Sequence, residues 1–127
     1  MRKEVKMWGE FVFNEPYEGQ DIYQINEIDL PISYIEFMKR HNGGEGDIGN
    51  TWFRLYRLEE LQELNDNLEI DKYLPKHIII GGCDGELYGI NADGYYFNVP
   101  EIIEEEYLTL LGNDIEQLSV QVNKLWD

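Results

Sequence analysis

The sequence lacks the features of a membrane-spanning or disulfide-bonded protein. No apolar run approaches the ~20 residues that a helix needs to cross a bilayer, and the start, MRKEVKMWGEF, is basic but has no apolar stretch like that of a secretory signal. The single cysteine, Cys83, cannot form an internal disulfide or share a metal ion with a neighbouring cysteine. We therefore expect a cytoplasmic protein in which Cys83 is a small buried side chain.

Basic residues are also scarce. The chain holds 10 Lys and Arg against 26 Asp and Glu, which gives a formal net charge of −16. Residues 7–38 and residues 77–123 contain no Lys or Arg. Nucleic acid and anionic membranes need positive charge at the contact, so this charge excludes both as direct partners and favours a basic partner. The alternative is that the acidity only keeps the protein soluble.

What the chain does contain is enough apolar material for one core. Apolar residues make up 43% of the 127 residues and aromatic residues 13%, which argues against disorder despite the charge. The length predicts one domain over residues 1–127, and we find no internal repeat, low-complexity segment or linker. The oligomeric state stays open between a monomer and a weak dimer.

Residues 41–50, HNGGEGDIGN, contain the G-x-G-x-x-G pattern of dinucleotide-binding loops. In those proteins a strand precedes the glycines and a helix follows them, so that the helix N-terminus faces the pyrophosphate. Here the apolar spacing predicts a helix before the glycines, at residues 31–41, and a strand after them. This order is the reverse of the one that a nucleotide site requires.

Acidic residues within the same glycine loop also oppose phosphate binding. Glu45 and Asp47 lie among the glycines with no basic residue between them, and two carboxylates repel a phosphate. We predict that this loop binds no nucleotide. Gly43 and Gly44 should instead adopt backbone angles that favour glycine, as at a helix C-terminus.

Periodicity predicts an α+β fold in which helices cover one side of a mostly antiparallel sheet. Asp-Gly turns separate three β-prone runs after residue 77, as in hairpins. Tyr34, Phe37 and Met38 share one helical face and should pack beneath the sheet. The expected strands are Thr51–Tyr56, Ile78–Gly82, Glu86–Asn91 and Tyr95–Val99, after a short strand or arm at 10–17, and the expected helices are residues 20–29, 31–41, 58–68, 102–112 and 115–126.

No catalytic constellation stands out in the sequence. His41 fits a helix C-terminus and His77 precedes a core strand, and neither has a Ser or Cys in an elbow motif beside it. The acidic turns carry no EF-hand spacing. We expect no enzymatic activity, no cofactor and no metal, with a small enzyme acting on a cationic substrate as the remaining alternative.

Three segments follow one another along the chain: LPISYIEFMKRHNGG, FRLYRLEELQELN and YLPKHIIIGGCDGELYGIN. Their order resembles that of the SUKH superfamily, which is related to the fungal Smi/Knr cell-wall regulator. The first segment resembles its signature helix, the second its strand and next helix, and the third its strand, acidic-glycine hairpin and second strand. NVPEI is similar to its valine-proline strand end. The resemblance covers roughly residues 22–125. The hairpin is leaner in glycine and acid than the family form, and the N-terminal arm has no obvious counterpart.

This resemblance implies an immunity protein that binds and neutralises a polymorphic toxin, since most bacterial members are thought to do so and many of the toxins are nucleases. The alternative within the family is a scaffold or regulator of the Smi/Knr type. A nuclease must be basic to hold phosphates, so the charge independently favours a basic protein toxin as partner. We expect acids and exposed aromatic residues near turns to form the contact: Glu45, Asp47, Trp52, Asp84, Glu86, Asp93 and Tyr95.

Overall fold

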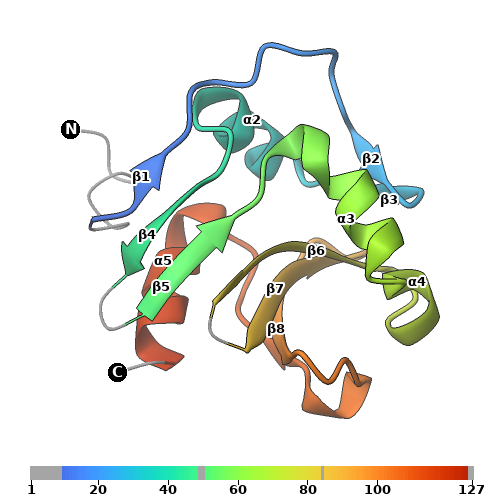
Figure 1. Cartoon of the computed structure of the whole chain (residues 1–127). Helices are drawn as coiled ribbons and strands as arrows, with labels where there is room; N and C mark the ends of the chain where they lie inside the picture. Colours follow the sequence, from blue (N-terminus) through green and yellow to red (C-terminus); the bar gives the residue numbers. More distant parts are fainter. Residues whose placement is uncertain (1–9, 49–50, 84, 126–127) are drawn as a thin grey trace.

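A seven-stranded antiparallel sheet, in the order β1-β4-β5-β6-β7-β8-β9, forms the frame of the protein (Figure 1). The structure, a computed structural model, describes residues 10–48, 51–83 and 85–125. A two-stranded hairpin, β2-β3, stands apart from this sheet. The strands are β1 Val12–Phe13, β2 Gln24–Ile25, β3 Ile28–Asp29, β4 Gly44–Ile48, β5 Thr51–Leu55, β6 His77–Cys83, β7 Glu86–Asn91, β8 Tyr96–Pro100 and β9 Thr109–Leu110.

The helices surround this sheet. In Figure 1, α5 (red) lies behind β4 and β5, whereas α3 and α4 lie beside β6 to β8. The helices are α2 Ile32–Arg40, α3 Leu61–Asn67, α4 Ile70–Tyr73 and α5 Ile115–Leu125, and short 3-10 turns occur at η1 Leu58–Glu60 and η2 Glu105–Tyr107. The α+β class with an antiparallel sheet, predicted from the sequence, is confirmed.

Two apolar clusters hold the elements together. In β6, Ile78 and Ile80 belong to the larger cluster with α2 and α5, while Ile79 belongs to a smaller one. Successive side chains of a strand point to opposite faces of the sheet, so the clusters lie on its two faces. The smaller cluster adds Ile70 of α4 and Leu74, which directly follows that helix. This cover on the second face was not predicted from the sequence pattern.

The main predictions for the core and the strands agree with the structure. Tyr34, Phe37 and Met38 of α2 are fully buried in the larger cluster. The four predicted strands correspond to β5, β6, β7 and β8, with their ends shifted by a residue or two at most. These strands are flanked by strong local turn signals, which explains why periodicity located them.

Residues 20–29 were predicted as a helix, but residues 24–29 form the β2-β3 hairpin and residues 20–23 are irregular. Ile22, Ile25 and Ile28 have helical spacing, but Asn26 and Glu27 both adopt positive φ, at 51° and 65°. Two consecutive residues with positive φ make the tight turn that suits a hairpin. The prediction was wrong because this turn carries Asn-Glu in place of the usual Asn-Gly.

Residues 102–112, also predicted as a helix, contain only η2 and the short strand β9. Leu110 lies opposite Phe97 of β8, and Thr109 lies opposite Asn98. The chain therefore completes the sheet at its edge. Pairing with a strand that is distant in sequence overrides the local helical pattern.

The predicted glycine loop is largely a strand. Residues 44–48 form β4 between β1 and β5. Gly43 and Gly44 do have positive φ, at 79° and 156°, as predicted. A Cβ atom on Gly44 would lie 2.2 Å from the carbonyl oxygen of Val12, so the glycine lets β1 approach β4 closely. Close strand approach, which local sequence does not reveal, explains this glycine.

Candidate protein-binding face

Strands β4 and β5 expose one face and bury the other. Along both strands, burial alternates strictly, because side chains alternate between the faces of a sheet. Glu45 lies opposite Arg54, and Asp47 lies opposite Trp52. The outward side chains of Glu45, Asp47, Trp52 and Arg54 thus form one patch, called the β4–β5 face below.

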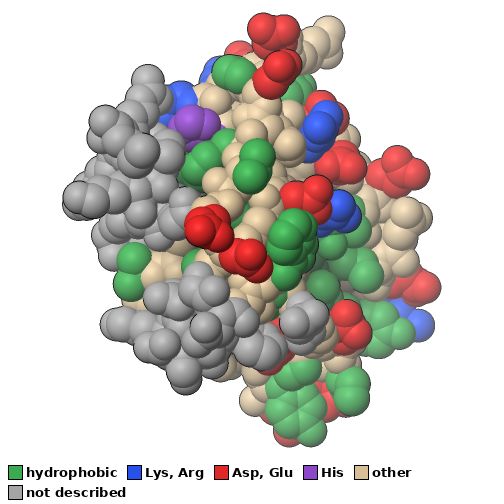
Figure 2. Space-filling view, turned by 60° about the vertical axis from the view of Figure 1, so that its left-hand side comes forward, with side chains coloured by type: hydrophobic (Ala, Val, Ile, Leu, Met, Phe, Trp, Pro, Cys, Tyr) green, Lys and Arg blue, Asp and Glu red, His purple; other side chains and the backbone are tan. Residues whose placement is uncertain are grey.

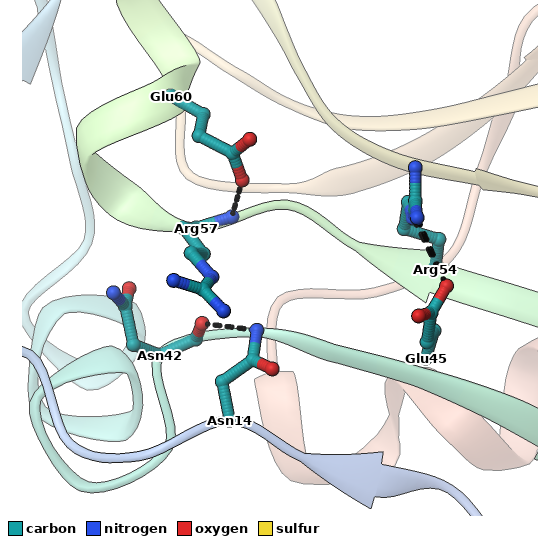
Figure 3. Close-up of polar contacts among 6 residues, drawn as sticks. All are labelled: Asn14, Asn42, Glu45, Arg54, Arg57 and Glu60. Atoms are coloured by element: carbon teal, nitrogen blue, oxygen red, sulfur yellow. Dashed lines mark hydrogen bonds and ion pairs between the residues drawn. The ribbon is translucent and has the colours of Figure 1, made fainter.

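The single base of this face is paired with one of its acids. Arg54 donates from Nη2 to Oε2 of Glu45 at 3.0 Å and from Nε at 3.3 Å (Figure 3). Both side chains are about half exposed, so the pair contributes little to stability. It does offset the charge of Glu45. Among the described residues no base pairs with Asp47, which therefore supplies the uncompensated charge of the face.

Trp52 is the aromatic part of the face. Its side chain is 52% exposed and lies directly across from Asp47. On β1, Val12 is 69% exposed and lies opposite Glu45, which extends the apolar surface. Figure 2, in which the side carrying β1 and β4 comes forward, shows red carboxylates among green hydrophobic side chains, with fewer blue bases. An aromatic anchor beside charged groups is typical of protein-binding surfaces.

A polar groove borders this face. One hollow of about 420 Å³ lies against β4, β5 and η1 and includes Glu45 and Arg54 in its lining. A second hollow, of about 590 Å³, continues along the arm of residues 13–19. Both hollows include Asn14, Arg57 and Glu59, so they form one groove. Its acids come from both walls: Glu15, Glu18, Glu45, Glu59 and Glu60.

Asn42 fixes the walls of this groove. Its side-chain oxygen accepts the N–H of Leu58 at 2.8 Å, and its side-chain nitrogen donates to Glu59 at 2.6 Å. Its backbone carbonyl accepts from the side chain of Asn14 at 3.0 Å (Figure 3). Because Asn42 is only 5% exposed, these bonds tie the arm, the end of α2 and the start of η1 together. The Asn of the Asn-Gly-Gly motif therefore has a structural role.

The predicted hairpin residue Glu86 does not join the β4–β5 face. It lies opposite Cys83, and Cys83 packs in the larger cluster, so Glu86 points to the other side of the sheet. One of its carboxylate oxygens is buried and has no hydrogen-bond partner among the described residues. Burial raises the pKa of Glu86 because a charged carboxylate loses hydration there. Asp84, its predicted neighbour, lies outside the described residues.

Asp93 and Tyr95 lie at a third place, in the turn between β7 and β8. The side-chain oxygen of Asn91 accepts the backbone N–H groups of both residues, each at 3.0 Å. Tyr95 is 42% exposed, as the sequence predicted. This turn joins the ends of β7 and β8 that are opposite to Glu86. The six predicted residues that the structure describes therefore do not form one surface: Glu45, Asp47 and Trp52 come together on the β4–β5 face, whereas Glu86 and the Asp93–Tyr95 turn lie elsewhere.

Arg54 and Val12 were missed by the sequence reasoning. The alternation of Trp52 and Arg54 around the buried Phe53 places them on one side of a strand, and this signal could have added Arg54. Val12 could not have been found, since its position depends on the pairing of β1 with β4.

The three residues considered for catalysis, His41, His77 and Cys83, each contact an aromatic residue of the fold. The His41 ring lies 4.4 Å from that of Phe13, and the His77 ring lies 5.1 Å from that of Phe97. Cys83 is buried, as predicted, and its thiol donates to the Tyr88 hydroxyl at 3.5 Å. In the part of the chain that the structure describes, no three His, Cys, Asp or Glu side chains gather as a metal site would require, and no helix has the length and hydropathy to traverse a bilayer.

The fold defines the class: an α+β protein whose long antiparallel sheet is backed by α2 and α5 and whose other face is open at β4 and β5. A family model, the SMI1 / KNR4 family (SUKH-1), matches residues 10–119, and the chain belongs to this family. Its members are generally non-enzymatic immunity proteins or regulators and commonly bind protein partners. Comparison with curated proteins gives no match.

Proposed function

We propose that this protein is an immunity protein that binds a basic protein toxin through the β4–β5 face and neutralises it in the cytoplasm. The observation that carries the proposal is the pairing of Asp47 with the exposed Trp52 on adjacent strands, in a family that includes immunity proteins. The acid attracts a cation, and the indole provides the apolar anchor that charge alone does not supply.

A nuclease domain is the toxin that suits this chemistry best. An enzyme that holds phosphates must present Lys and Arg at its substrate site. A protein of net charge −16 would be steered toward such a surface and would cover it against nucleic acid. The association rate should then fall as ionic strength rises.

The groove beside the face extends the proposed contact. Carboxylates from both of its walls would bind basic side chains of the toxin, while Arg57 and the paired Arg54 would meet an acidic group. Such a surface with both acidic and basic groups favours one relative orientation of the two proteins, because other orientations would bring like charges together at a cost in binding free energy. The groove therefore supports selection of one toxin over other basic proteins.

Co-expression with a toxin encoded by the adjacent gene tests the function. Cells that produce both proteins should grow, and the purified proteins should form a complex. We expect Trp52→Ala to weaken the complex by about 30-fold, or ~2 kcal/mol. Asp47→Lys should slow association by about tenfold at low salt, and added salt should reduce that difference.

Glu63→Lys is the matched control, since it makes the same charge change on the exposed side of α3. If Glu63→Lys slows association as much as Asp47→Lys does, the β4–β5 face is not the contact. If cells die equally fast with and without this protein, and no complex forms, the immunity function itself is wrong.

A further inference from the structure

A second group of exposed apolar side chains lies at the end of the molecule that follows β8. Tyr73 is 49% exposed, Ile102 is 70% exposed and Tyr107 is 52% exposed. A hollow of about 360 Å³ is lined by Tyr73, Ile102 and Ile103 together with Glu101 and Glu104. In Figure 1 the orange segment after β8 lies below α4, on the side away from β1.

These side chains are carried by an anchored segment. Ile103 and Leu108 pack against the smaller cluster, and the N–H of Glu101 donates to the carbonyl of Gly85 at 2.9 Å. The N–H of Tyr107 donates to the carbonyl of Glu104 at 3.0 Å. The backbone is thus held on the protein while Ile102 and Tyr107 point outward, which favours a preformed binding surface over one that must be ordered first.

Most of the charge around this surface is negative. Glu101 and Glu104 line the hollow, and Glu105 and Glu106 follow in η2. No Lys or Arg occurs between residues 77 and 123, and the base at the edge of the surface is Lys72, whose Nζ lies 5.5 Å from the centre of the Tyr73 ring. The carboxyl of Glu104 forms a hydrogen bond with that of Glu106, which raises the pKa of Glu104, since two neighbouring carboxylates resist ionising together. Among the described residues Lys72 pairs with Glu69, at 3.9 Å, and none of the ion pairs involves these four glutamates.

We propose that Tyr73, Ile102 and Tyr107, with the four glutamates between residues 101 and 106, form a second docking surface for a basic amphipathic protein segment. One apolar side chain of the segment would enter the hollow beside Ile102, and Lys or Arg on either side would bind Glu101 and Glu104. A second copy of this chain does not fit, because two such surfaces would bring eight carboxylates together. The inference does not rest on the proposed function, since it concerns residues outside the β4–β5 face.

The test separates apolar docking from nonspecific attraction of cations. Two short synthetic helical peptides with identical lysines are compared by fluorescence anisotropy, one with leucines along one face and the other with serines at the same positions. The wild-type protein should bind the leucine peptide about tenfold more tightly. The double variant Ile102→Ser/Tyr107→Ser should bind both peptides equally.

Trp52→Ser is the matched control, because it removes an exposed aromatic residue from the other surface and should preserve the tenfold preference. Amide chemical shifts of the wild-type protein, recorded with the leucine peptide, should change at Tyr73 and at residues 101–107. The proposal is overturned if the preference persists in the double variant, if Trp52→Ser removes it equally, or if the shift changes fall elsewhere.

Discussion

At the scale of the residue, the first and last residues of the Asn-Gly-Gly motif stabilise different parts of the fold. Asn42 joins the arm, α2 and η1 through its hydrogen bonds. Gly44 instead makes room for β1, because its Cβ position would meet the Val12 carbonyl at 2.2 Å and the Phe11 ring at 2.8 Å. Neither residue needs a ligand to explain it.

Replacing Gly44 by alanine should lower the free energy of unfolding by about 2–4 kcal/mol, since the change combines a strained φ with a clash against backbone. Gly112→Ala is the matched control: Gly112 also has positive φ, at 89°, but its added Cβ would meet nothing within 4 Å. That variant should lose only about 1 kcal/mol. Urea unfolding of both variants provides the comparison, and equal losses would contradict the close approach of β1.

The lack of nucleotide binding at these glycines stays a prediction. Calorimetric titration of the wild-type protein with NAD or ATP should show no saturable heat. A micromolar isotherm would mean that the helix-strand order around the glycines is compatible with a phosphate site after all.

At the scale of the element, a segment was predicted correctly where residues near it in the sequence determine its structure, and wrongly where contacts with distant residues do. The strand Glu86–Asn91 was predicted at its observed bounds, because Asp-Gly turns flank it. The segment that forms β9 was predicted as a helix, because its strand state depends on pairing with β8. The same difference applies to the site: Trp52 was predicted as exposed from local pattern, whereas its grouping with Asp47 depends on strand register.

Glu86, at the end of the β6–β7 hairpin, gives a pH-dependent prediction. Burial raises the pKa of Glu86 in the folded state. At pH values between the unfolded and the folded pKa, the folded protein therefore binds more protons than the unfolded chain. Its contribution to the free energy of unfolding must therefore decrease as pH rises through that window. Glu86→Gln removes this loss and should be more stable than wild type at neutral pH.

The measurement is urea unfolding of Glu86→Gln and wild type from acidic to neutral pH. The stability difference should be smallest in acid, grow as pH rises and level off above the folded pKa. Glu63→Gln, an equal charge change at an exposed position on α3, corrects for net charge. A Glu86→Gln difference that does not vary with pH, or that grows toward acid, would be incompatible with a raised pKa.

At the scale of the whole molecule, the charge of −16 acts against the folded state, although it would serve recognition of the proposed basic partner. Like charges confined to a compact surface repel one another more than they do in an unfolded chain. Salt weakens this repulsion, with a screening length of about 8 Å at physiological ionic strength. The same salt weakens attraction to a basic partner.

Raising NaCl from ~0.01 M to ~0.2 M should therefore increase the thermal midpoint of the isolated protein, because screening relieves the repulsion between its acids. Differential scanning calorimetry checks the direction. KCl at the same concentrations should have the same effect if screening is the cause. A midpoint that stays constant or falls in both salts would show that net repulsion does not limit the stability.

The strict alternation in β4 and β5 divides the residues of this hairpin into an inward set and an outward set. Positions 46, 48, 53 and 55 point into the protein and specify its shape, whereas positions 45, 47, 52 and 54 point out. The outward set can be rewritten without disturbing the inward set, because no side chain serves both. If the β4–β5 face binds a partner as proposed, substitutions at these four outward positions would change the binding specificity while leaving the architecture unchanged.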